Sequence, residues 1–97
     1  MDDFQIVATH NILEKLKIHG VNILEVEEAF FNLNGTPLVD NRSEHKTRPP
    51  TVWFCSVTEE GRILKVVGIP LSGTKEFVLK SAYDAEEREI ELYENNQ

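Results

Sequence analysis

Residues 51–84 read TVWFCSVTEEGRILKVVGIPLSGTKEFVLKSAYD, and this stretch decides the fold. Its β-branched and aromatic residues are concentrated in separate runs, and such runs predict β-strands. The predicted strands cover residues 51–58, 63–69 and 76–83. The connections, residues 59–62 and 71–75, are short and contain glycine, as hairpin loops do. The stretch therefore predicts consecutive strands of an antiparallel sheet.

Helix signals lie on both sides of this stretch. Thr9 is a suitable N-cap for a first helix that ends at Gly20, and Asn22 begins a second helix with Glu25 at the capping-box position. Asp84 is expected to cap a closing helix over residues 85–93, and short strands are expected over 4–7 and, at the sheet edge, over 37–42. These signals predict a single α+β domain over residues 1–97, with two N-terminal helices, an antiparallel sheet of three to four strands and a C-terminal helix.

The composition narrows the classes of protein. The 97 residues include 40% hydrophobic side chains, enough for one modest core. Cys55, the only cysteine, lies in an apolar run, so a buried structural thiol is expected rather than a disulfide framework or a metal cluster. No apolar run approaches the roughly 20 residues that span a bilayer, and the start Met1-Asp2-Asp3 is unlike a secretory or mitochondrial leader. A cytoplasmic protein without a membrane segment is expected.

Charge is distributed unevenly along the chain. The net charge of −7 disfavours strong, unassisted binding to nucleic acid. Residues 36–84, in contrast, hold seven basic and six acidic residues. An acidic chain therefore has a mildly basic predicted sheet, which is a candidate surface for handling phosphate.

Four residues of this block are candidates for catalysis of RNA cleavage. The reaction needs a base for the 2′-hydroxyl proton, cations for the phosphorane charge and an acid for the leaving 5′-oxygen. His45 titrates near neutrality and suits a base or an acid. Lys65 and Lys80, on strands expected to be neighbours, would flank one phosphate, and Tyr83 would donate a proton or stack on a base.

Arg42, which suits a bidentate phosphate contact, and Trp53 are the candidates for substrate binding. Each candidate also has a structural interpretation. Arg42 would pair with Asp40 or Glu44, and Lys65 would point to solvent or meet an acid. His45 would simply be solvated, and Trp53 and Tyr83 would pack in the sheet. The sequence has no glycine-rich phosphate loop, paired metal-ligand motif or nucleophile elbow, so neither a metal nor a cofactor is expected.

Several short motifs resemble those of the BrnT-type toxin family. They are Lys17-Ile18-His19-Gly20-Val21, the segment 25–31, Gly61-Arg62-Ile63-Leu64-Lys65-Val66-Val67, and Leu79-Lys80-Ser81-Ala82-Tyr83-Asp84 before the last helix. The resemblance covers roughly residues 4–94. It implies a RelE-like fold, a ribonuclease activity and a DNA-binding antitoxin that neutralises the toxin.

One position departs from the family pattern, because Tyr83 stands where the strand motif usually has arginine. With residues 42–45 and 49–54, the segment 81–84 is similar to a divergent subgroup. The first hypothesis is therefore a toxin of a type II toxin-antitoxin pair, a metal-independent endoribonuclease held by a basic or ribbon-helix-helix antitoxin. The second is a non-catalytic protein-interaction module of the same fold, whose acidic helices bind a basic partner. The sequence leaves open whether RNA is bound and whether the chain forms a homo-oligomer.

Overall fold

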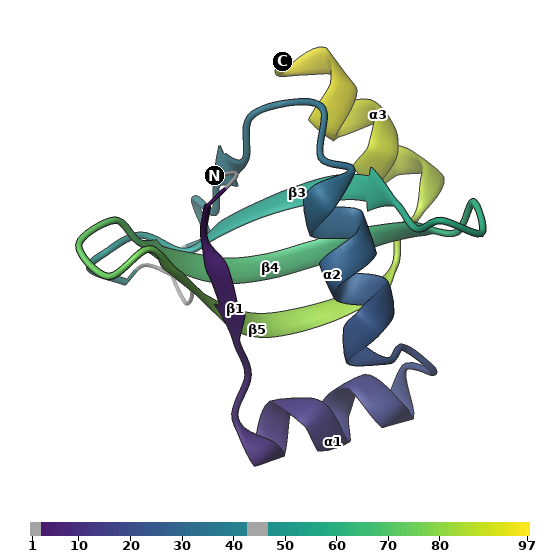
Figure 1. Cartoon of the computed structure of the whole chain (residues 1–97). Coiled ribbons are helices and arrows are strands. Elements are labelled where there is room, and N and C mark those ends of the chain that lie inside the picture. The colour runs from purple at the N-terminus through teal and green to yellow at the C-terminus, as the bar shows by residue number, and fades with distance from the viewer. Residues whose placement is uncertain (1–2, 43–46) are drawn as a thin grey trace.

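The sheet has five strands in the spatial order β1-β5-β4-β3-β2 (Figure 1). In chain order the strands are β1 (Gln5–Val7), β2 (Leu38–Val39), β3 (Val52–Val57), β4 (Ile63–Leu71) and β5 (Glu76–Asp84). They belong to a computed structural model that describes residues 3–42 and 47–97. The pairs β2–β3, β3–β4 and β4–β5 are antiparallel, which confirms both predicted hairpins.

The first strand differs from the expected sheet, because β1 pairs with β5 in the parallel direction. Gln5 lies opposite Glu76, and the Gln5 amide donates to the Lys75 carbonyl at 2.8 Å. The sheet therefore has five strands, where three to four were expected, and is mostly, not wholly, antiparallel. The α+β class, with two N-terminal helices and a C-terminal helix, is confirmed.

The first two helices begin where their capping residues predict. Helix α1 (His10–Ile18) follows Thr9, whose hydroxyl accepts from the Ile12 amide at 3.3 Å. Helix α2 (Ile23–Phe31) has a complete capping box. The Asn22 side chain accepts from the Glu25 amide at 2.9 Å, and the Glu25 carboxylate accepts from the Asn22 amide at 3.2 Å. Gly20, between the helices, has a φ of 67°, a conformation that favours glycine.

The predicted cap of the last helix is wrong. Helix α3 (Glu87–Asn95) follows Glu86, whose amide donates to the Glu89 carboxylate at 2.9 Å. Asp84 is instead the last residue of β5, and its carboxylate binds the Arg62 guanidinium with Nε–Oδ1 at 2.6 Å. Arg62, in the loop just before β4, therefore binds the carboxylate that the local sequence would assign to the helix.

The helices cover both faces of the sheet. Phe54 of β3 meets Phe30 of α2 with ring centroids 5.8 Å apart, whereas the preceding Trp53 meets Tyr93 of α3 at 5.9 Å. Because consecutive strand residues point to opposite faces, α2 and α3 lie on opposite sides of β3. Figure 1 shows α2 crossing in front of the sheet, with α1 below β5 and α3 beside β3. Among the described residues, no helix combines the length and apolar character needed to cross a bilayer.

Candidate functional site

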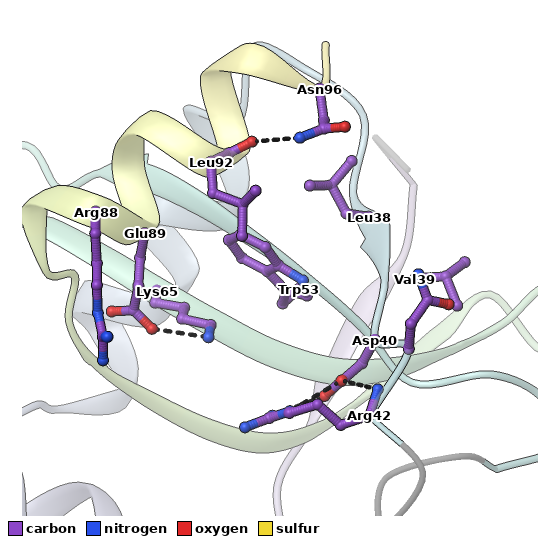
Figure 2. A pocket seen from close by; sticks show the side chains of 11 residues that line it. Leu38, Val39, Asp40, Arg42, Trp53, Lys65, Arg88, Glu89, Leu92 and Asn96 are labelled. Atoms are coloured by element: carbon purple, nitrogen blue, oxygen red, sulfur yellow. Dashed lines mark hydrogen bonds and ion pairs between the residues drawn. The ribbon is translucent and has the colours of Figure 1, made fainter.

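A pocket of about 750 Å³ lies between the edge strand β2, the middle of the sheet and α3 (Figure 2). Leu38 and Leu92 form apolar parts of its wall. Trp53, Lys65 and Arg42 also line it, so the structure brings together three residues that the sequence marks as site candidates. The pocket joins apolar, aromatic and cationic groups on one face of the sheet.

Lys65 is a buried cation in this pocket. Its residue is 8% exposed, and its Nζ donates to the Glu89 Oε2 at 2.8 Å. Burial alone would lower the pKa of Lys65, but the hydrogen bond that Lys65 donates to Glu89 and the neighbouring negative charge outweigh burial, so the pKa is raised. Burial likewise would raise the pKa of Glu89, and the bond to Lys65 reverses that effect, so the pKa is lowered. Both groups are therefore charged at neutral pH.

Trp53 forms part of the pocket from β3. The residue is only 8% exposed, and the Lys65 ammonium lies 4.6 Å from the ring centroid, a cation–π contact. The tilted contact with Tyr93 covers the ring further. The packing role expected of this tryptophan is thus present, and the negative face of the ring also attracts the buried ammonium.

Arg42 lies at the rim of the pocket and is held by Asp40. Its Nη2 and Nε contact the two carboxylate oxygens at 2.8 and 3.1 Å, which is the bidentate geometry of an arginine–carboxylate pair. The Asp40 side chain is 5% exposed, whereas that of Arg42 is 53% exposed. The guanidinium therefore has a fixed position but still faces solvent at the entrance.

The remaining predicted site residues are placed differently. Tyr83 is opposite Lys65 on β5, with the ammonium 5.9 Å from its ring, and it also meets the His19 ring at 5.7 Å. Lys80 is exposed and does not line the pocket. The β4–β5 register shifts after Val67, which leaves Lys80 without a partner residue on β4. His45 lies outside the described residues.

Two carboxylates of the site, Glu89 and Asp40, are absent from the candidates that the sequence suggests. The sequence suggests Asp40 only as a partner for Arg42. Glu89 lies on an acidic helix whose glutamates all look like solvated residues. Its spacing was nevertheless informative, because Glu89 is four residues before the buried Tyr93 and therefore lies on the helical face that packs on the sheet.

The arrangement suits recognition of a group that is both anionic and aromatic. Lys65 and Arg42 supply cationic donors, Trp53 supplies an aromatic surface, and Glu89 supplies an ionised base beside a cation. Each of the two cations already has a carboxylate partner, so an incoming anion has to compete for its donors. Within residues 3–42 and 47–97, no cluster of three or more His, Cys, Asp or Glu side chains could hold a metal ion.

Cys55 is buried, as the sequence predicts. Burial raises the pKa of the Cys55 thiol to about 11, and the nearby Glu89 charge adds to this effect. A neutral thiol is a poor nucleophile, so its position supports the structural interpretation.

Comparison with protein-family models, with curated proteins and with solved structures finds no match to this chain.

Proposed function

We propose that this chain is the toxin of a type II toxin-antitoxin pair, related to the BrnT-type family, and that it acts in the cytoplasm as a metal-independent endoribonuclease. The observation that supports this function is the Lys65–Glu89 pair in the pocket, where an ionised base and a cation lie 2.8 Å apart beside Trp53. The motifs of residues 17–21 and 61–67 give additional support.

In this proposal the Glu89 carboxylate accepts the proton of a ribose 2′-hydroxyl. The 2′-oxygen then attacks phosphorus, the bond from phosphorus to the 5′-oxygen breaks, and a 2′,3′-cyclic phosphate forms. Lys65 and Arg42 stabilise the negative charge that develops on the phosphoryl oxygens. Tyr83 or His45 donates the proton that the leaving 5′-oxygen needs.

The test is RNA cleavage by the purified chain together with growth of cells that express it. The wild type should cleave RNA and arrest growth. The double variant K65M/E89Q removes base and cation together and should lose cleavage by about a hundredfold or more. Lys75→Met, which changes an exposed lysine away from the pocket, is the matched control and should behave like wild type. A wild type without cleavage or toxicity would refute the nuclease.

A second candidate function is a non-catalytic protein-interaction module. Two observations favour it: the cations Arg42, Lys65 and Arg88, which line the pocket, are already paired with carboxylates, and the acidic helix α2 exposes large apolar side chains. In both candidates the partner is a small basic or ribbon-helix-helix protein that acts as the antitoxin. A wild type that binds such a partner but does not cleave RNA would favour the module.

A further inference from the structure

The outward face of α2 carries an exposed apolar pair. Phe31 is 86% exposed and Leu24 is 60% exposed, whereas Val26 and Ala29 of the same helix are fully buried against the sheet. Leu24 and Phe31 are seven residues apart, so they project from the helix within about 20° of each other, roughly two turns apart. The helix therefore has an apolar stripe on the side opposite the one that packs on the core.

Glutamates flank this stripe on both sides. Glu27 and Glu28 lie between Leu24 and Phe31 in sequence, and helical spacing places one on each side of the apolar line. The helix contains three glutamates and no lysine or arginine. Glu25 is neutralised by Arg62 at 3.1 Å, but in the described part of the chain neither Glu27 nor Glu28 forms an ion pair.

The loop between β3 and β4 extends the same acidic surface. The Glu28 carboxylate accepts from the Glu59 amide at 3.2 Å, and the Asn32 side chain donates to the Glu59 carboxylate at 3.3 Å. These bonds hold the loop beside the C-terminal end of α2, and the loop adds the exposed Glu59 and Glu60. The apolar stripe is thus bordered by carboxylates from two separate segments.

We infer that this surface, formed by Leu24, Glu27, Glu28, Phe31 and the neighbouring Glu59 and Glu60, is the docking site for a basic amphipathic helix of a protein partner. Apolar residues of that helix would cover Leu24 and Phe31, and its lysines or arginines would meet the flanking glutamates. The inference deepens the second candidate function and does not depend on RNA cleavage.

The negative charge of this surface favours a basic helix over the other possible occupants, which are a second copy of the chain, an anionic membrane and a nucleic acid. A second copy of the chain would bring the same glutamates face to face, and an anionic membrane or a nucleic acid would bring phosphates to them. Each of these would be repelled. A cationic partner gains electrostatic attraction over the same area and removes the two exposed apolar side chains from water.

The experiment measures binding of a designed helical peptide of about 21 residues, with leucine at the a and d positions and lysine at the flanking positions. Fluorescence anisotropy of the labelled peptide is recorded with the full chain and no RNA. The peptide should bind, more weakly as salt increases. The double variant L24S/F31S should weaken binding by about tenfold or more. Ile18→Ser, on α1 and 83% exposed, should not.

Two control peptides distinguish the contribution of the apolar stripe to binding from the contribution of charge. A scrambled peptide of the same composition, and a peptide with glutamate in place of lysine, should both bind at least about tenfold more weakly. Equal binding of wild type and L24S/F31S, or absence of binding by the basic peptide, would overturn the inference. Binding of anionic vesicles, or a dimer that L24S/F31S dissociates, would also overturn it. RNA cleavage measured on the same variants should be unchanged, so failure of the nuclease and failure of this surface are distinguishable.

Discussion

Replacing Lys65 and Glu89 together should restore most of the stability that replacing Lys65 alone removes. Lys65→Met leaves the Glu89 carboxylate in the pocket wall without its cation. The double variant K65M/E89Q instead leaves two neutral side chains of similar size. The pair therefore offers a direct comparison between breaking a buried ion pair and removing it.

The magnitude follows from how far the pair is buried. The side chains of Lys65 and Glu89 are 10% and 16% exposed. Removing one member of a fully buried pair costs about 3–5 kcal/mol. Glu89 keeps its bond from the Glu86 amide at 2.9 Å and some contact with water, so we expect about 2 kcal/mol for Lys65→Met. In a domain of this size that corresponds to a fall in Tm of about 8–16 °C. The double variant should be within about 1 kcal/mol of wild type.

Urea denaturation at neutral pH of the wild type, both single variants and the double variant gives the coupling energy. Lys75→Met, whose lysine side chain is 56% exposed, serves as the control and should change stability by no more than about 0.5 kcal/mol. The reasoning is refuted if Lys65→Met costs no more than this control, or if the effects of the two single variants simply add.

The same pair predicts a dependence of stability on pH. The pKa of Glu89 is lower in the folded chain than its ordinary value of 4.5. The contribution of Glu89 to stability is therefore fully present above about pH 4.5, and it is lost as the pH falls through the pKa that Glu89 has in the folded chain. The pKa of Lys65 is raised, so the lysine contributes below its ordinary 10.5 and loses that contribution as the pH rises through the folded value. Glu89→Gln should flatten the acid limb of a stability–pH curve, and Glu91→Gln, at an exposed position of the same helix, should not.

Three further outcomes are expected. Arg62→Ala should lower the free energy of unfolding by about 2 kcal/mol, because two carboxylates and a backbone carbonyl lose their donor. Arg62→Lys should recover only part of that loss. If Arg62→Ala and Arg62→Lys were equally stable in thermal melts, the role given to the guanidinium would be contradicted. Cys55, with a pKa of about 11, should react with iodoacetamide at pH 8 far more slowly in the folded than in the urea-unfolded chain, as mass spectrometry would record. Gly68→Ala should cost about 2 kcal/mol because the added methyl group would meet the Phe77 ring, whereas Gly73→Ala, with open space around it, should be nearly neutral in the same melts.

Local interactions explain what the sequence could predict of the fold. The strand runs and the caps at Thr9 and Asn22 depend on residues within three or four positions of one another, and the structure confirms them. The misassigned cap at Asp84 shows where this reasoning ends. A carboxylate before a helix is a good cap only if no distant cation binds it first, and Arg62 does so from the loop that precedes β4.

The candidate site was predictable in its residue types but not in its pairings. Lys65 was expected to point to solvent or meet an acid, and it meets Glu89 across two elements that are distant in sequence. Lys80 was expected to flank the same phosphate, but the register shift in β5 changes its position relative to β4, and no local sequence signal marks that shift.

The parallel pairing of β1 with β5 has a consequence for how the chain folds. Gln5 is among the first described residues, and its partner Glu76 begins β5, the last strand in the chain. Every other described element except α3 therefore lies between the two strands in the sequence. Contacts of such long sequence separation close large loops and slow folding. During synthesis β1 has to wait, unpaired, until β5 has left the ribosome. A strand of only three residues presents few free backbone groups during that delay, which limits its chance of pairing with another nascent chain.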